Sequence, residues 1–132
     1  EGTDAADLFR AMLIDECIAT SDDLLTKTPQ GADEEAKKLA RQEYSQKGFM
    51  FRAMNCLEAK VKDFDTSGPF LLGDKLCIAD LFLHNLTSMI KAGQFDHIPA
   101  EYMDGYPALT KQMEAVEADA KLREYKEAFP GL

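Results

Sequence analysis

Three residue types that can act as nucleophiles, acids or metal ligands lie close together in the second half of the chain. Cys77, Asp80 and His84 follow one another at i, i+3 and i+7, so on a helix they could share one face. A cysteine near a histidine suggests a nucleophile or a metal site. A metal ion needs more ligands than these, held by supporting residues. The start of a helix explains Cys77 and Asp80 better, so we predict no catalytic residue and no metal ligand here.

Cys77 and Asp80 have the spacing of a capping box, with Cys77 at the N-cap position and Asp80 three residues later. They follow a glycine turn at Gly73. The Asp80 carboxylate can then accept backbone N–H groups of the first helical turn, where the helix dipole also favours negative charge. A thiol is a weaker acceptor than a hydroxyl, so we expect Cys77 to make a weak cap. This pair is predicted to be structural.

A pair of neighbouring acids, Asp22 and Asp23, is the second group with possible chemistry. A carboxylate can hold an ammonium group through a charge-assisted hydrogen bond. Spacing alone favours a simpler interpretation, in which the two acids belong to the solvated face of a surface helix. The sequence by itself therefore leaves both interpretations open.

The cysteines indicate a reducing compartment. There are three, Cys17, Cys56 and Cys77, and no CxxC motif occurs. An odd number of cysteines in stretches that read as helical suits free thiols in the cytoplasm. We expect all three to be buried and inert, because a free cysteine packs as a small hydrophobic residue.

Composition excludes several classes of function. The chain has 132 residues, of which 45% are hydrophobic, so one domain with a real core is expected. The net charge of −9 comes without a basic stripe, which disfavours nucleic-acid binding. No apolar run approaches the ~20 residues of a membrane helix, and no signal peptide opens the chain. Because the chain begins with Glu1, we expect it to be part of a longer protein.

The apolar pattern predicts five helices and almost no strand. Gly48 interrupts the second helix, where a bend is expected. The helices are expected at about Asp4–Lys27 (with Thr3 as N-cap), about Asp33–Phe64, Ile78 to about Lys91, from Pro107 onward, and about Ala118–Ala128.

The third of these helices is apolar around much of its circumference, so we predict that it is the most buried. Inward-facing residues are also predicted at both ends of the chain. They are Leu8, Met12, Cys17 and Leu24 in the first helix, and Leu122, Tyr125 and Phe129 in the last.

The order of these elements and the helix start at Gly73–Asp80 resemble the C-terminal domain of cytosolic glutathione transferases. In that family Ser or Thr usually stands where this chain has Cys77. Phe95–Pro99 and Tyr106–Leu109 are similar to segments of the sigma-type members. The resemblance covers essentially residues 1–132, and it implies one all-α domain, a helical bundle of about five helices.

The resemblance also implies roles for individual residues. Asp23 stands where sigma-type members use an acid to contact the γ-glutamyl amine of glutathione bound to the other subunit, and Asp22 is expected to orient it. Leu25 and Phe82 are placed by the resemblance in the pocket of the acceptor substrate. Ala19 replaces an Asp found in some relatives, so no metal cluster is expected.

A glutathione transferase of this type is a cytoplasmic detoxification enzyme, with glutathione as co-substrate, a hydrophobic electrophile as acceptor, and a homodimeric state. The thioredoxin-like domain that activates the glutathione thiol is not in these 132 residues. We therefore expect this chain alone to be inactive. Two alternatives stay open because fold does not determine function. One is a non-catalytic assembly module, as in translation factors and synthetase complexes, and the other is a carrier of lipophilic ligands.

Overall fold

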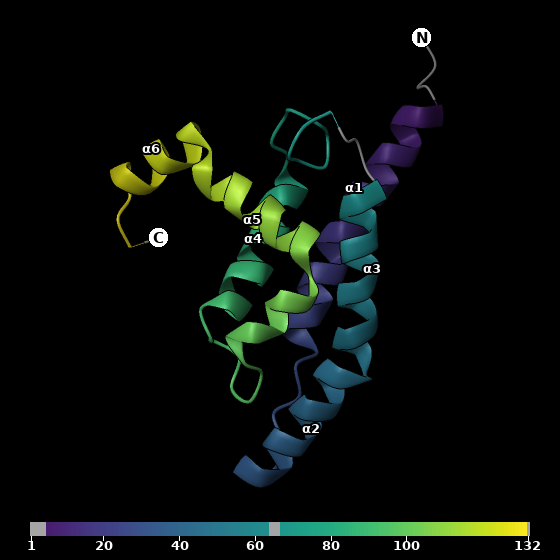
Figure 1. Cartoon of the computed structure of the whole chain (residues 1–132), viewed down its shortest axis with the longest axis vertical. Coiled ribbons are helices and arrows are strands. Elements are labelled where there is room, and N and C mark those ends of the chain that lie inside the picture. The colour runs from purple at the N-terminus through teal and green to yellow at the C-terminus, as the bar shows by residue number, and fades with distance from the viewer. Residues whose placement is uncertain (1–4, 64–66, 132) are drawn as a thin grey trace.

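The computed structural model describes residues 5–63 and 67–131, and this part of the chain is helical (Figure 1). Its only extended pairs are two isolated bridges within the turn at residues 70–75. The prediction of an all-α bundle is therefore confirmed. The predicted N-cap Thr3 and the residues Asp4 and Phe64 lie outside the described part. The elements are α1 (Ala5–Thr26), α2 (Glu34–Gln46), α3 (Phe49–Asp63), α4 (Ile78–Lys91), the 3₁₀ helix η1 (Ala100–Gly105), α5 (Pro107–Ala118) and α6 (Ala120–Ala128).

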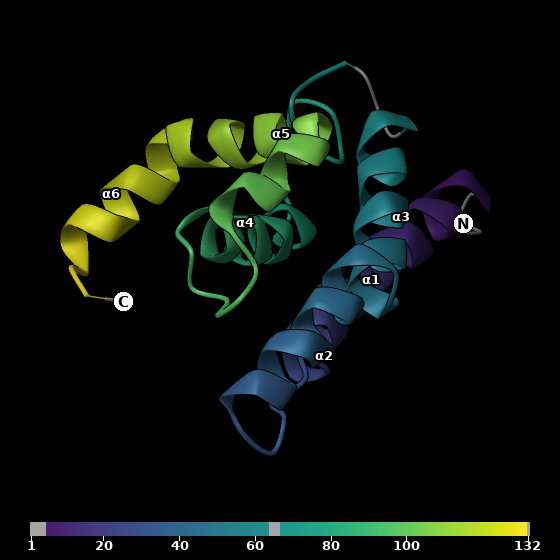
Figure 2. The ribbon, with the colours of Figure 1, turned by 60° about the horizontal axis from the view of Figure 1, so that its bottom comes forward.

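Helix α4 forms the centre of the bundle, as predicted. It packs against α1, α5 and η1, and Figure 2 shows α5 crossing over it. Two apolar residues of its first turn, Ile78 and Leu81, are the exception, because they remain exposed. The buried side of α4 consists of Ala79, Asp80, Leu83, Leu86, Thr87 and Ile90.

The single long helix expected at residues 33–64 is two helices, α2 and α3. The break lies at Lys47 and Gly48, whose N–H groups both donate to the Glu43 carbonyl, at 3.0 and 2.8 Å. A Cβ atom on Gly48 would come within 2.8 Å of the Tyr44 Cα atom. Glycine therefore lets the chain turn tightly here, and the new helix starts at Phe49.

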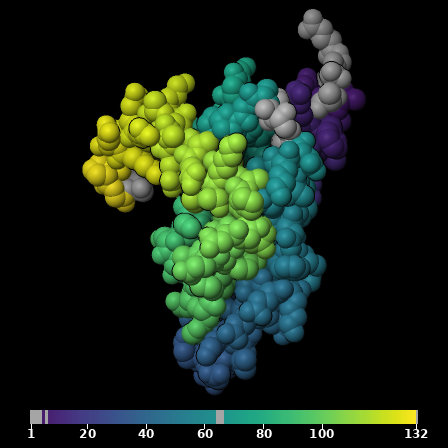
Figure 3. Space-filling view, in the orientation of Figure 1, coloured from purple at the N-terminus to yellow at the C-terminus, as the bar shows by residue number. Residues whose placement is uncertain are grey.

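The predicted inward faces at the two ends of the chain are wrong for four of the seven residues, namely Leu8, Met12, Tyr125 and Phe129. Leu8 and Met12 lie on the exposed side of α1, although Cys17 and Leu24 on the same helix are buried. Helix α6 packs only against α5 among the named elements, and it projects from the body of the molecule (Figure 3). Tyr125 and Phe129 are consequently 52% exposed, and they contact each other with ring centroids 5.0 Å apart.

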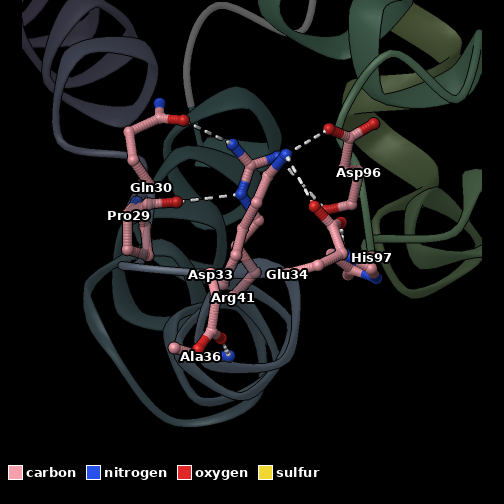
Figure 4. A network of polar contacts seen from close by, with 9 residues as sticks. Pro29, Gln30, Asp33, Glu34, Ala36, Arg41, Asp96 and His97 are labelled. Atoms are coloured by element: carbon pink, nitrogen blue, oxygen red, sulfur yellow. Dashed lines mark hydrogen bonds and ion pairs between the residues drawn. The ribbon is translucent and has the colours of Figure 1, made fainter.

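A buried arginine joins the loop after α1 to the loop after α4. The Arg41 guanidinium donates to the Pro29 carbonyl at 2.9 Å, to Gln30 Oε1 at 3.4 Å and to the Asp96 carbonyl at 3.2 Å (Figure 4). Lys37 adds an ion pair to the Asp96 carboxylate at 2.6 Å. Since Arg41 lies on α2, this network holds α2 and both loops in one arrangement.

A second long-range contact fixes the start of α5. The Glu58 carboxylate, on α3, accepts the N–H groups of Ala108 and Leu109 at 2.8 and 2.9 Å. A negative charge at a helix N-terminus is favoured by the free N–H groups and by the dipole. Pro107 opens this helix, as expected, because its missing N–H costs nothing there.

Candidate functional site

The predicted acidic pair lies near the C-terminal end of α1. Asp22 is exposed, while the Asp23 side chain is 44% exposed and pairs with Lys27, its Oδ2 atom lying 2.8 Å from Lys27 Nζ. The same ammonium group lies 5.0 Å from the centroid of the Phe49 ring. A carboxylate and an aromatic face thus hold one ammonium group between them, by an ion pair and a cation–π contact.

Helix α2 holds this end of α1 in place. The Tyr44 hydroxyl donates to the Leu24 carbonyl at 2.9 Å, and the buried Thr28 hydroxyl donates to the same oxygen at 2.7 Å. Burial raises the pKa of the Tyr44 phenol, a hydrogen bond with Thr28 opposes that shift, and the charge of Asp23 adds to it. These two hydrogen bonds therefore anchor the backbone of α1 at the residue directly after Asp23.

The two acids lie at the end of α1 where the helix dipole is negative, and this affects which charge they can bind. Free carbonyl groups give the C-terminal end of a helix a partial negative charge. Asp22 and Asp23 add two carboxylates to that end, whereas the last turn of α1 contains no basic residue. The sum of these charges favours a cation at Asp23, and in this structure Lys27, the residue directly after the helix, supplies it.

The start of α4 uses Asp80 as a fully buried acceptor, with 0% exposure. Its Oδ2 atom accepts the Cys77 N–H at 2.9 Å, and its Oδ1 atom accepts the Leu71 N–H and the Gln112 amide, both at 3.0 Å. The reciprocal contact of the Cys77 thiol with the first turn is present but is not a full cap hydrogen bond. Asp80 thus joins the turn at Leu71, the start of α4, and α5.

Within the described part of the chain, the Gln112 side chain leaves one buried polar atom without a hydrogen-bond partner. Its amide nitrogen faces Asp80 and also donates to the Asp80 carbonyl at 3.2 Å. If the Gln112 amide were turned by 180°, its oxygen would face the Asp80 carboxylate, and the two oxygen atoms would repel each other. That oxygen, Gln112 Oε1, is consequently buried without a partner among the described residues.

His84 does not join Cys77 and Asp80 in a reactive group. Its Nε2 atom lies 3.4 Å from Glu117 Oε1 on α5, whereas the Asp80 carboxylate is occupied by N–H donors. In residues 5–63 and 67–131 no group of three or more His, Cys, Asp or Glu side chains is arranged to hold a metal ion.

The cysteines differ from one another. Cys17 is fully buried, and burial raises its thiol pKa to about 11. Cys77 is half-buried, and burial also raises its pKa. Cys56 is exposed, so the prediction that all three are buried is wrong for this residue. It lies on the outer side of α3, between the exposed Asn55 and the buried Leu57.

The two residues assigned to the acceptor pocket are both half-buried. Leu25, on α1, packs against the main core cluster, and Phe82 lies on the second turn of α4. Three surface hollows in the described part of the chain are lined by other residues. The most enclosed of the three, about 230 Å³, lies between the end of α3, the start of α5 and the turn at Phe70 and Leu71.

Comparison with known families agrees with this arrangement of helices. The family model described as "Glutathione S-transferase, C-terminal domain" matches residues 22–128. The chain belongs to this family. Searches of curated proteins and of solved structures returned no match. The matched stretch contains Asp22, Asp23 and the helix start at Cys77–Asp80.

In this glutathione transferase domain, no described helix is long and apolar enough to cross a membrane. Sequence reasoning missed Gln112, Glu58 and Lys27. Gln112 and Glu58 act on partners 32 and about 50 residues away, so no local spacing could have identified them. Lys27 could have been found, because it follows Asp23 at i+4, the spacing of a helical ion pair.

Proposed function

We propose that this chain is the C-terminal domain of an enzyme that conjugates glutathione to hydrophobic electrophiles in the cytoplasm. In that enzyme it would form one wall of the acceptor site and half of the dimer contact. Membership of the family supports the assignment. The observation that carries it is the partly exposed carboxylate of Asp23, which lies at the negative end of α1 and holds an ammonium group in this structure.

The reaction needs a division of labour between two domains. A glutathione thiolate attacks the electrophilic carbon of the acceptor, and a carbon–sulfur bond replaces the bond to the leaving group. A separate thioredoxin-like domain in the complete protein would activate that thiol. In our proposal this chain contributes binding residues and no catalytic residue.

Asp23 would bind glutathione held by the other subunit of a homodimer. Its carboxylate would accept a charge-assisted hydrogen bond from the γ-glutamyl ammonium group, which is the same chemical group as the end of Lys27. Asp22, exposed and adjacent, would orient it by its charge. Leu25 and Phe82 would contact the electrophile.

The test uses the complete protein that contains this domain. Titration calorimetry with glutathione should show binding about 10- to 150-fold weaker for Asp23→Ala, since a hydrogen bond to a charged group contributes about 1.5–3 kcal/mol. Asp22→Ala should lose less. Asp74→Ala is the matched control, because this acid is exposed in the turn before α4.

Two results would contradict the proposal. One is unchanged affinity for Asp23→Ala. The other is an equal loss in an engineered monomer, because the contact is proposed to cross the dimer interface. A complete protein that binds no glutathione and conjugates no electrophile would indicate an assembly module of the same fold instead.

A further inference from the structure

Lys27 occupies the place that a ligand ammonium group would need at Asp23. We propose that Lys27 is a built-in competitor of glutathione at this carboxylate, and that Phe49 forms the second wall of the ammonium site. This inference rests on the proposed function, in which Asp23 binds the γ-glutamyl amine. It adds two residues that determine affinity there, Lys27 against binding and Phe49 in favour of it.

The argument starts from the chemistry of the occupant. Lys27 ends in a primary ammonium group, and so does the γ-glutamyl moiety of glutathione. The Lys27 nitrogen lies 2.8 Å from Asp23 Oδ2 and 5.0 Å from the Phe49 ring centroid. These are the distances of a charge-assisted hydrogen bond and of a cation–π contact. The structure therefore contains a formed ammonium site with an internal ligand.

Two ammonium groups cannot share this site without cost. A second cation on the other oxygen of Asp23 would lie beside Lys27 and be repelled by it. Lys27 must therefore move before glutathione can use the full charge of the carboxylate. Its movement is easy, because the side chains of Lys27 and Asp23 are 57% and 44% exposed, and exposed pairs of this spacing are weak.

Phe49 remains when Lys27 leaves. It is the first residue of α3, it packs against the core cluster, and its ring lies 6.4 Å from that of Tyr44. The ring is thus fixed by its neighbours and does not depend on Lys27 for its position. An incoming ammonium group would meet the same aromatic face that Lys27 covers in the free protein.

The experiment measures glutathione affinity of the complete protein by calorimetry at low salt. Lys27→Gln should bind glutathione about 1.5- to 5-fold more tightly, the range expected for releasing an exposed ion pair. Lys38→Gln is the matched control, since it removes the same charge from an exposed position on α2. Lys27→Arg keeps the charge and should stay close to the original affinity.

A glutathione analogue that lacks the γ-glutamyl amine separates this effect from overall charge. Lys27→Gln should leave the affinity for the analogue unchanged. In the Lys27→Gln background, Phe49→Leu should weaken glutathione binding about 2- to 5-fold, the loss expected for an exposed cation–π contact. It should not weaken binding of the analogue.

The outcomes distinguish the inference from the function on which it rests. If Asp23→Asn leaves glutathione affinity unchanged, both the contact and the inference fail. If Asp23→Asn weakens binding but Lys27→Gln behaves like Lys38→Gln, the contact stands and the competitor is refuted. An equal gain for the analogue also overturns the competitor, because the effect would then come from net charge. Thermal unfolding followed by circular dichroism checks that each variant is folded.

Discussion

Replacing Asp80 by alanine should destabilise the domain more than the loss of an ordinary helix cap. The substitution leaves the buried Leu71 N–H and the Cys77 N–H without their acceptor, while the Gln112 amide keeps its bond to the Asp80 carbonyl. Each buried donor left unpaired costs about 1–3 kcal/mol. The buried Leu71 N–H and the part-buried cap at the Cys77 N–H together give about 1.5–5 kcal/mol, compared with about 0.5–2 kcal/mol for a cap alone. That is a large part of the ~5–15 kcal/mol by which a domain is stable.

The assay is urea unfolding followed by far-ultraviolet circular dichroism, with Asp33→Ala as the control. Asp33 is the exposed N-cap of α2, where its side chain accepts the Ala36 N–H at 2.8 Å. It therefore reports the cost of a cap without the buried connections. Asp80→Asn should fall between the two variants, because its amide keeps one acceptor but turns a donor toward a backbone N–H. If Asp80→Ala costs no more than Asp33→Ala, the account of Asp80 as a buried connection between elements is wrong.

Four further predictions concern the thiols, the acid response and activity. Cys77→Ser should be neutral or slightly stabilising in urea melts, because a hydroxyl accepts the first-turn N–H better than a thiol. A thiol reagent should modify the exposed Cys56 in the native protein within minutes, whereas Cys17, with its pKa of about 11, should react only on unfolding. The ion pair with Lys37 lowers the pKa of Asp96 from 3.8, so its contribution to stability is present above that pH and is lost as the pH falls through the lowered value. The urea midpoint of Asp96→Asn should therefore fall less between pH 7 and pH 3 than that of the original chain. This chain alone should not conjugate glutathione to a chlorinated aromatic electrophile above the uncatalysed rate, and turnover like that of a complete transferase would refute the division of labour between domains.

Local signals predicted the centre of the fold well. The expected helix from Ile78 to about Lys91 has the bounds of α4, because capping residues and turn glycines act within a few residues of one another. Pro107 marked the start of α5 for the same reason. Both helix starts depend on local backbone geometry, and the side chains within a few residues determine that geometry.

Amphipathic pattern alone did not predict which apolar residues are buried at the ends of the chain. Met12 and Phe129 occupy positions that would face inward on a helix with neighbours on that side. Helix α6 has only α5 beside it, and the outer side of α1 has no partner element in the described part of the chain. A periodic stripe shows which face of a helix is apolar, but burial also requires another element to cover that face.

Tertiary contacts separate Asp80, predicted to be structural from its cap spacing, from Asp23, the acid that we propose binds glutathione. Both are aspartates within a few residues of a helix end. Asp80 has no exposed surface, and fixed N–H donors from three elements occupy its carboxylate. The Asp23 side chain is 44% exposed, and it pairs with Lys27, whose side chain is 57% exposed and which directly follows the same helix. A carboxylate saturated by fixed donors has no capacity left for a ligand, whereas one that is paired with a movable cation can exchange that cation for another. The distinction depends on tertiary contacts, and it makes Asp23 the acid on which a test of function should concentrate.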